Sequence, residues 1–562
     1  MHFEPRTLNA FKPRTERLAS LESQLFDILV IGGGITGAAV ARDAAARGLS
    51  VCLLEKDDWA AGTSWRSTKL VHGGLRYLET GEVGLVFESL RERAILMAAA
   101  PHLVRPAEFL FPEYSDRGRP PWQVALGLTA YDLLSLGRAP SRHRRLSRAD
   151  VLRREALLAG PTLVSGAVYP DGRTDDARLT LENVLDAVTL GATAVTRIEV
   201  VALVRGAKVI EGAAARDVET GRSFAVRARV VVNAAGPWGD RIRSLEDSGV
   251  ENILRLSRGT HLTVPFGRLP ISRIVAFPLA DGRLLFAVPD GAVTMLGTTD
   301  TDFSGSPDEV SADKADLEYL LRAARLTFPE AAIGEKDVVS TFSGLRPLVY
   351  EAGKSLSETS REEAIQVSEG GLLTITGGKL TTHRRMGEKA VDRARPLLLS
   401  QGVAVGASAT RDRPLPGKPP SPMAEWQIHL LGLRELGHPR LADDTVAHLS
   451  YRYGGRASEV LGLSIGDRSL GRPIVEGLPD IDAEIVFAAR EEDARSVSDV
   501  LIRRTHLFWQ ASDQGLACVE RVGALLGREL AWSDSEIRAS AAAYEKEVAR
   551  SRAWRASSSP TG

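Results

Sequence analysis

One short segment, STKLVHGGLRYLETGE at residues 67–82, combines several side chains that could take part in chemistry. It holds a lysine, a histidine, an arginine and a tyrosine around two adjacent glycines. Glycine lets a backbone approach a flat ligand, because no Cβ stands in the way. Arginine suits anionic substrates, because its planar guanidinium donates paired hydrogen bonds. The segment could therefore hold a ring system beside a charged substrate, or it could be an ordinary glycine loop with a surface arginine.

The residues before this segment have the pattern of a βαβ unit. The apolar run DILVI at 27–31 leads into GGGITG and an alanine-rich stretch, and a second apolar run, SVCLLE, ends at Glu55. Gly32, Gly34 and Gly37 match G-x-G-x-x-G, which allows a tight turn, close approach to a pyrophosphate and close helix packing. The helix N-terminus would face the phosphates, and Glu55 would accept hydrogen bonds from a ribose. This pattern predicts a dinucleotide site.

Two later segments also run from an apolar strand into a turn of small residues. They are VRARVVVNAAGPWGDRI, with its turn at 233–239, and GGLLTITGGKLTTHRRM, with its turn at Gly377 and Gly378. Three such junctions predict one cofactor domain assembled from separated segments. Alternating segments between them, such as THLTVPF and RLLFAVP, predict antiparallel strands of an inserted substrate domain. After the proline-rich linker RDRPLPGKPPSP, helical spacing predicts a helical C-terminal domain.

The bulk properties limit the classes of protein to which the chain could belong. Its 562 residues are too many for one core and predict two or three domains. A net charge of −1 provides no general attraction for nucleic acid. With only Cys52, expected in a buried strand, and Cys518, neither a disulfide framework nor a metal site is predicted. The absence of a signal-peptide pattern and of a long apolar run predicts a cytoplasmic protein.

The ordered motifs resemble those of FAD-dependent glycerol-3-phosphate dehydrogenases. Residues 27–79 are similar to that family's N-terminal region, and DDARLT, NAAGPWGD, RGTH, GTTDT, SGLRP and TGGKLTT follow in the family's order. The resemblance implies an α/β fold: a Rossmann-type FAD-binding domain, an inserted antiparallel-sheet substrate domain and a C-terminal helical domain. The implied FAD-binding segments are 22–100, 165–250 and 345–400. The substrate domain would comprise 101–164 and 251–344, the helical domain 414–550, and flexible tails 1–21 and 551–562.

The resemblance also implies FAD as the cofactor. Ser67, Thr68 and Lys69 would contact it, and Gly73 and Gly74 would pass close to its ring. A helix N-terminus within 377–382 would stabilise the negative charge of the reduced flavin. The implied cofactor-binding residues are Gly32, Gly34, Ile35, Thr36, Gly37, Glu55, Lys56, Ser67, Thr68, Lys69, His72, Gly73, Gly74, Ala235, Gly236, Trp238, Gly378, Lys379, Leu380 and Thr381.

The reaction implied by the resemblance is oxidation of sn-glycerol 3-phosphate to dihydroxyacetone phosphate, with hydride transfer from C2 to flavin N5. Electrons pass to a quinone in many family members and to oxygen in a related branch. His261 is the first choice for the base that takes the C2 hydroxyl proton. A histidine that only hydrogen-bonds within a strand, and electrostatic stabilisation by lysine or arginine, stay open as alternatives. The implied catalytic residues are His261, Arg346 and Lys379, and the implied substrate-binding residues are Arg76, Tyr77, Arg346 and Arg361.

One residue departs from the family pattern. His383 stands where a tyrosine is common, and the change is predicted to be neutral because this residue would lie beyond the cofactor contacts. Alternative functions are an oxidase of another small hydroxy or amino acid, an oxygen-using glycerol-3-phosphate oxidase, and an FAD-binding module without catalysis. Fewer arginines would be needed for a carboxylate substrate than for a phosphate.

Residues 121–137 are apolar apart from Asp132, and a cluster of arginines from Arg138 to Arg154 follows. Apolar surface beside basic residues suits an anionic bilayer. The alternative is a buried helix followed by a solvated loop. The expected location is therefore cytoplasmic, with peripheral attachment to the inner face of the cell membrane and a homodimer as further expectations.

Overall fold

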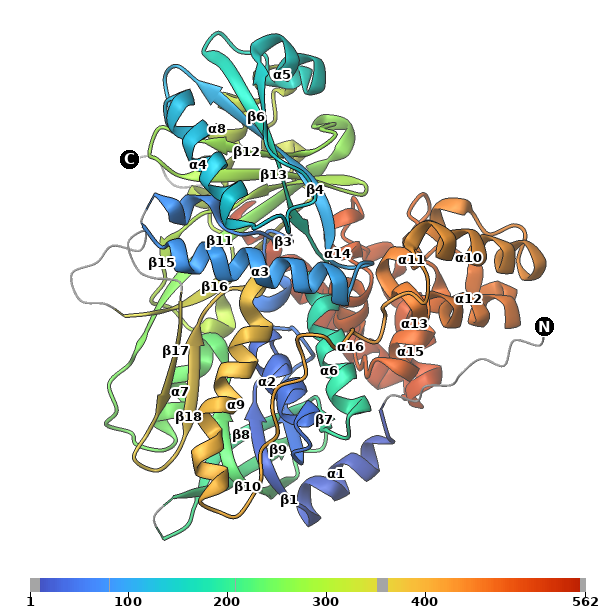
Figure 1. The fold of residues 1–562 in the computed structure, drawn as a ribbon. Helices are drawn as coiled ribbons and strands as arrows, with labels where there is room; N and C mark the ends of the chain where they lie inside the picture. The colour runs from blue at the N-terminus through green and yellow to red at the C-terminus, as the bar shows by residue number, and fades with distance from the viewer. Residues whose placement is uncertain (1–10, 80, 208, 351–361, 556–562) are drawn as a thin grey trace, which may run out of the picture.

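The computed structural model describes residues 11–79, 81–207, 209–350 and 362–555. Two sheets are stacked one above the other, and a group of helices lies beside them (Figure 1). The fold is the predicted α/β architecture with a C-terminal helical domain.

The first sheet has eight strands in the order β17-β18-β10-β1-β2-β7, with β8 and β9 continuing from β10. The central strand β1 is parallel to both its neighbours, β2 and β10. The chain first adds β2 and β7 on one side of β1 and later adds β10 and β18 on the other side. This reversal of direction leaves a crevice at the carboxyl end of β1. The strands are β1 (Leu25–Ile31), β2 (Val51–Leu54), β7 (Thr193–Val195), β8 (Ile198–Arg205), β9 (Ile210–Asp217), β10 (Ser223–Asn233), β17 (Glu363–Val367) and β18 (Leu373–Gly377).

Three helices pack together against this sheet: α2 (Ile35–Ala46), α6 (Asp176–Thr189) and α9 (His383–Leu399). The small side chains of α2 allow its neighbours to come close. At Gly387 of α9, an added Cβ would lie 2.5 Å from the carbonyl oxygen of Ala39, so only glycine fits there. This contact fixes α2, whose N-terminus begins at the glycine turn.

The second sheet has ten strands in the order β15-β11-β14-β13-β12-β4-β6-β3, with β16 beside β11 and β5 beside β6. Its pairs are antiparallel except for β12 with β4. Helices α3 (Val83–Ala99), α4 (Pro121–Leu134), α5 (Arg148–Arg154) and α8 (Lys314–Thr327) belong to this part of the chain or to its connections. Helix α7 (Gly239–Ser244) instead packs against β10 and β18 of the first sheet. The strands are β3 (Leu70–Val71), β4 (Arg105–Tyr114), β5 (Arg144–Ser147), β6 (Leu163–Arg173), β11 (Leu254–Pro265), β12 (Ile274–Pro278), β13 (Leu284–Asp290), β14 (Val293–Gly297), β15 (Thr301–Asp302) and β16 (Ser340–Val349).

The domain boundaries differ from the predicted ones at three strands. β3, β6 and the end of β16 fall in segments predicted for the FAD-binding domain, but all three belong to the second sheet. β6 pairs with β4 from Leu163 to Arg173, and β16 pairs with β11 as far as Val349. These strands continue across the junction because the cavity lies between the two sheets.

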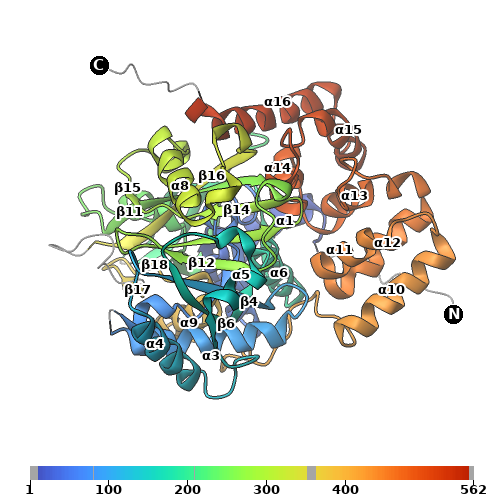
Figure 2. The same ribbon diagram turned by 90° about the horizontal axis from the view of Figure 1, so that it is seen from above.

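The C-terminal helices cover one side of both sheets, as the view from above shows (Figure 2). The linker before them is packed rather than loose: Leu415 is buried, and the Gly417 amide donates to Glu182 at 3.2 Å. The helices are α10 (Met423–Gly437), α11 (Asp443–Tyr453), α12 (Ala457–Gly466), α13 (Asp482–Glu491), α14 (Leu507–Gln510), α15 (Val519–Leu530) and α16 (Asp534–Ser551).

The prediction of flexible tails is wrong for the parts of them that the structure describes. Residues 14–23 form helix α1 (Arg14–Ser23), in which Leu21 is buried and Arg17 forms an ion pair of 2.7 Å with Asp493. At the other end, Trp554 is buried in the core of the second sheet. The rest of both tails, 1–10 and 556–562, lies outside the described residues.

Candidate active site

A cavity of about 460 Å³ lies at the carboxyl end of β1, between the two sheets. Segments that are far apart in the sequence converge on it. The predicted site residues that line it are Gly32, Gly34, Ile35, Thr36, Glu55, Lys56, Ser67, Thr68, His72, Gly74, Arg76, Tyr77, Ala235, Gly236, Trp238, His261, Arg346, Gly378, Lys379, Leu380 and Thr381.

The glycine turn forms one end of the cavity. Glu55, just after β2, accepts a hydrogen bond of 2.6 Å from the Gly33 amide and another from Asp57. Burial raises the pKa of Glu55 to about 7. The Ser64 hydroxyl accepts from the Ile35 amide at 2.9 Å, at the first turn of α2. This end therefore combines backbone donors, a helix N-terminus and a carboxylate, the groups that bind a dinucleotide.

A cluster of side chains from both sheets lies at the rim near this end. The ammonium of Lys56 lies 4.5 Å from the ring centroid of Trp238. Asp308, from the substrate domain, accepts from Lys56 at 2.7 Å, from the indole of Trp238 at 2.8 Å and from Arg241 at 3.0 Å. Although partial burial works against ionisation, these donors lower the pKa of Asp308 to about 2. Asp308 is therefore a carboxylate that joins the two domains beside the cavity.

The segment 67–82 turns sharply at Gly74, whose φ is +79°. An added Cβ would lie 2.3 Å from the Tyr77 ring, so glycine is required for both conformation and space. The Lys379 ammonium lies 3.4 Å from the centroid of the same ring. Tyr77 therefore brings the two predicted substrate-side motifs together, and Thr381 reinforces this contact by donating to the His72 carbonyl at 3.2 Å.

His261 of β11 is 2% exposed, and its Nε2 lies 2.9 Å from the Thr68 hydroxyl. Its ring stacks on Phe342, with 5.0 Å between the centroids. Burial, and then the charges of Arg346 and Lys69, hold the pKa of His261 well below its usual range. The imidazole is therefore neutral at neutral pH and bonds to the neighbouring segment rather than within its own strand.

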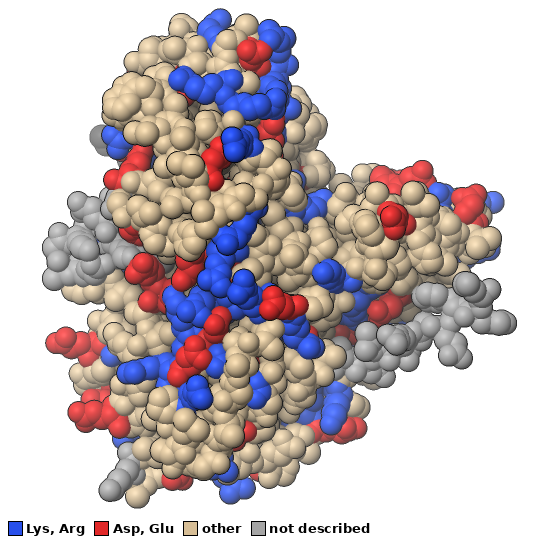
Figure 3. Space-filling model, viewed as in Figure 1, with Lys and Arg blue, Asp and Glu red and all other residues tan. Residues whose placement is uncertain are grey.

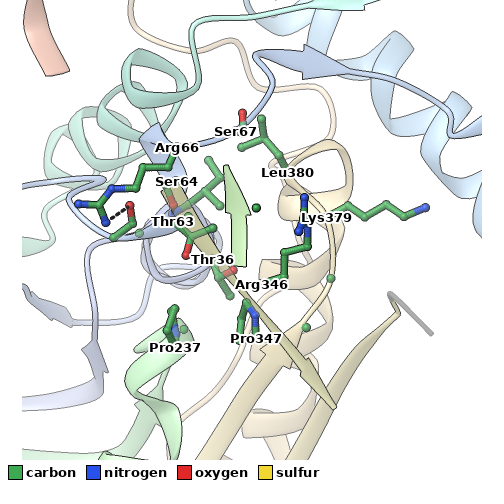
Figure 4. Close-up of a pocket in the computed structure, with 18 of the residues that line it drawn as sticks. Thr36, Thr63, Ser64, Arg66, Ser67, Pro237, Arg346, Pro347, Lys379 and Leu380 are labelled. Carbon is green, nitrogen blue, oxygen red and sulfur yellow. Dashed lines mark hydrogen bonds between the residues drawn. The ribbon is translucent and has the colours of Figure 1, made fainter. Parts of the chain in front are cut away.

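Arg346 of β16 is held by several oxygen atoms at the cavity wall. It donates to Asp300 at 3.1 Å, to the Thr299 carbonyl at 3.2 Å and to the Thr298 hydroxyl at 3.2 Å. Figure 4 shows Arg346 on the side of the cavity where Lys379 and Leu380 lie. Arg66 points away from Arg346, toward the Gly62 carbonyl oxygen (Figure 4).

Three predicted cofactor contacts do not line the cavity. The Lys69 ammonium is buried and pairs with the carboxylate of Asp176 at 2.6 Å. A Cβ on Gly73 would collide with Leu90 and with the Tyr131 hydroxyl, so this glycine serves helix packing. A Cβ on Gly37 would lie 1.9 Å from the Gly32 carbonyl oxygen, which agrees with the packing role expected for this glycine.

Arg361 and His383 are the two remaining positions considered in the sequence. Arg361 lies outside the described residues. His383 does not line the cavity, as expected, but is fully buried. Its Nδ1 donates to the Leu380 carbonyl oxygen at 2.7 Å, and burial lowers its pKa to about 3. Its neutral imidazole fixes the start of α9.

Several lining residues were missed by the sequence analysis. Ser64 and Arg66 lie within the recognised N-terminal region, and Asp300 lies within the recognised motif GTTDT, so adjacency to a motif was the available signal. Arg283 and Phe286 belong to a segment predicted only as a strand. Nothing in their spacing indicates that they reach the cavity. The pairing of β13 with β14 brings Phe286 there, and a hydrogen bond to the Thr298 carbonyl oxygen holds Arg283 there.

The residues present fit FAD. The glycine turn and Glu55 suit its dinucleotide part, and the cationic side chains of Arg346 and Lys379 line the same cavity. Buried Glu55 follows the second strand of the βαβ unit, the position from which an acidic residue binds the ribose in dinucleotide-binding folds.

Comparisons with known proteins agree with this site. A family model described as FAD dependent oxidoreductase matches residues 27–384, and one for the C-terminal domain of alpha-glycerophosphate oxidase matches residues 408–537. The aerobic glycerol-3-phosphate dehydrogenase of Bacillus subtilis is 36% identical over 496 residues, which are 88% of this chain and 89% of the relative. The glycerol-3-phosphate dehydrogenase of Synechocystis is 35% identical over 92% of this chain and 95% of the relative.

A solved structure gives the same result. The glycerol-3-phosphate dehydrogenase from Bacillus halodurans, complexed with FAD, superposes with a TM-score of 0.79 at 30% identity, covering 96% of this chain and 97% of that one. Fold and cavity thus define an FAD-dependent oxidoreductase. Within that class, the chain belongs to the glycerol-3-phosphate dehydrogenase family.

Proposed function

We propose that this chain oxidises sn-glycerol 3-phosphate to dihydroxyacetone phosphate and passes the electrons to a quinone. The main support is that His261, Arg346 and Lys379 line one cavity with the dinucleotide-binding turn, although they lie on separate elements. This combination supplies a neutral base, a bidentate anion donor and a second cation beside the cofactor. The family membership of the chain supports the same substrate.

Each residue would have a separate task in this reaction. Bound FAD supplies the hydride acceptor, N5, for the hydrogen on C2. Arg346 binds the phosphate, His261 accepts the proton of the C2 hydroxyl, and Lys379 stabilises negative charge on that oxygen. Phe286 and His72, whose ring centroids are 6.1 Å apart, would shield this part of the cavity from water.

The decisive experiment follows the visible absorbance of the purified holoenzyme without oxygen. Adding sn-glycerol 3-phosphate should bleach the flavin promptly, whereas glycerol, glycine and malate should not. Readmitting oxygen or a quinone analogue then identifies the acceptor by the faster return of colour. Flavin that stays oxidised with glycerol 3-phosphate would contradict the proposed substrate.

An oxidase of another small hydroxy or amino acid is the competing proposal. It is distinguished by Arg346→Ala, which should weaken the apparent affinity for glycerol 3-phosphate strongly if Arg346 binds a phosphate. Unchanged substrate affinity in this variant would favour the competitor.

We further propose that α4 attaches the protein to an anionic membrane surface. One face of the helix is buried through Val124, Leu128 and Tyr131. Large apolar side chains on the other side are 62–70% exposed: Trp122, Leu126, Leu133 and, just beyond the helix, Leu136. The helix is therefore only partly buried, which differs from the fully buried helix of the alternative interpretation.

The charges beside α4 support the same attachment. Arg138, Arg142, Arg144, Arg145 and Arg148 follow the helix and are exposed. In Figure 3 the upper part of the molecule, where α4 lies, is mostly uncharged, with more basic than acidic side chains around it. Apolar groups beside arginines match the boundary between acyl chains and anionic headgroups. No helix in the described ranges is long and apolar enough to span a bilayer.

A further inference from the structure

Arg283 is a cation at the cavity wall that neither the motifs nor the proposed mechanism uses. It stands at the start of β13, half-buried, and lines the cavity together with Leu284 and Phe286. Its guanidinium donates to the carbonyl oxygen of Thr298 at 2.9 Å and lies 5.0 Å from the centroid of the Tyr319 ring. Among the described residues its guanidinium forms no direct ion pair with a carboxylate. The carboxylate of Asp281 instead accepts from the Arg283 backbone amide at 3.0 Å and from the Tyr319 hydroxyl at 2.7 Å.

Arg283 and Arg346 are held by the same short segment. Arg346 donates to the hydroxyl of Thr298 and to the carbonyl of Thr299, while Arg283 donates to the carbonyl of Thr298. The segment follows β14, which pairs with β13 on one side and with β11 on the other. Arg283 directly precedes β13, and Arg346 lies on β16, which pairs with β11. Two guanidiniums from different strands therefore converge on one place in the cavity wall.

The two arginines differ in net charge. Asp300 lies 3.1 Å from Arg346 and cancels much of its field at a distance. The Arg283 guanidinium contacts a carbonyl oxygen and an aromatic ring rather than a carboxylate, so less of its field is cancelled than at Arg346. A phosphate dianion is bound best by donors with net positive charge, and arginine provides both the charge and a planar pair of donors.

We propose that Arg283 is a specificity residue that binds the substrate phosphate together with Arg346. Arg346 would orient the phosphate, and Arg283 would supply the net charge that selects a phosphorylated triol over an uncharged one. This inference rests on the proposed function for its substrate, but the anion site itself can be tested independently.

The test uses the holoenzyme and its Arg283→Ala and Arg283→Gln variants. Inorganic phosphate is titrated while the perturbation of the flavin spectrum is followed, and steady-state kinetics are measured with glycerol 3-phosphate and with glycerol. We expect the Kd for phosphate and the KM for glycerol 3-phosphate to rise about 10- to 100-fold, with kcat much less changed. The kcat/KM for glycerol 3-phosphate should therefore fall, while glycerol should leave the flavin oxidised in the wild type and in the variants. Arg283→Lys should show a smaller loss, because it keeps the charge and loses only the planar fork.

Arg322→Ala is the matched control. Arg322 lies 6.0 Å from the centroid of the same tyrosine ring, but it is exposed and does not line the cavity. This variant should bind phosphate like the wild type.

The outcomes separate the two proposals. If the wild type binds phosphate but glycerol 3-phosphate does not bleach its flavin, the proposed function fails, and the phosphate titration of the Arg283 variants still decides the anion site. If the Arg283 variants retain their flavin and bind phosphate as tightly as the wild type, the role of Arg283 is overturned. If one of the three Arg283 variants misfolds, phosphate binding by the other two still tests the role of Arg283. Arg283→Lys is the variant that keeps the positive charge.

Discussion

At the residue scale, burial determines the protonation state that the proposed mechanism needs. His261 is enclosed by Phe342 and Thr68 and faces the positive charges of Arg346 and Lys69. All of these disfavour the imidazolium, so the pKa is lowered well below 6.5. A base must be unprotonated to accept a proton, and His261 is therefore ready to act throughout the neutral range.

The pH dependence of the reaction follows from this shift. Because a lowered pKa keeps the imidazole neutral, kcat/KM should be flat from pH 6.5 upward and fall only on the acid side. Replacing the base by His261→Gln should lower kcat by about 10²- to 10⁴-fold with little change in phosphate affinity. Stopped-flow measurement of flavin reduction across pH checks both statements. A normal kcat in the His261→Gln variant would contradict the role of His261 as the base and would favour electrostatic stabilisation by Lys379 or Arg346.

Single residues were predictable from the sequence where a motif holds them together. The glycine turn, Glu55 and the segment around Gly74 are local patterns, and they line the cavity. The ion pair of Lys69 with Asp176 could not be predicted from local sequence, because its partner is 107 positions away. Arg283 was missed for the same physical reason, since its partner at the site, the Thr298 carbonyl oxygen, is 15 positions away.

At the element scale, α4 has an apolar side without a partner among the described residues. Trp122 and Leu126 are 63% and 64% exposed, one helical turn apart. Their burial in a lipid interface would favour attachment, because each large apolar side chain contributes roughly 1.5–3 kcal/mol when removed from water.

Introducing charge on this side of α4 tests the attachment. Trp122→Glu with Leu126→Glu should weaken partitioning onto phosphatidylserine vesicles by at least about tenfold, because apolar burial is lost and negative charge is added. Vesicle sedimentation measures this. Leu436→Glu is the matched control, since Leu436 is 88% exposed on α10, far along the chain in the helical domain. Equal partitioning of all three proteins would contradict a role for α4.

Most elements follow from sequence periodicity, and the exceptions have a common cause. β1, α2 and β2 arise from continuous apolar runs that end at glycines. Helix α1 was predicted to be a flexible tail because its own sequence is polar. Arg17 is ordered by Asp493, 476 positions later, and short-range patterns contain no information on such a partner.

At the scale of the whole molecule, buried ion pairs join the helical domain to the FAD-binding domain. Arg178 of α6 meets Glu492, and its guanidinium also lies 4.2 Å from the centroid of the Tyr453 ring. Asp58 binds Arg504 at 2.9 and 3.0 Å. These charges are nearly inaccessible to water, so each depends on its partner.

Breaking one such pair should destabilise the docking of the helical domain. Arg178→Met leaves Glu492 buried without its main partner and should cost about 3–5 kcal/mol. Adding Glu492→Leu should recover part of that loss, because the stranded charge is removed. Thermal unfolding and limited proteolysis measure the effect. The exposed pair of Arg222 with Glu22 is the control, and Arg222→Met should cost less than about 1 kcal/mol. A similar loss in both single variants would show that burial of the pair is unimportant.

The strand order of the first sheet has a consequence for how the protein is made. β1 ends at Ile31, but β10 and β18, which complete its side of the sheet, end at Asn233 and Gly377. A ribosome adding about 5–20 residues per second needs roughly 20–70 s between the first of these strands and the last. Throughout that interval the nascent chain exposes apolar strand edges that have no pairing strand. The nucleotide-binding crevice is therefore still incomplete. Capture of the flavin is therefore a late event of translation, and a molecular chaperone has most to protect before residue 377 leaves the exit tunnel.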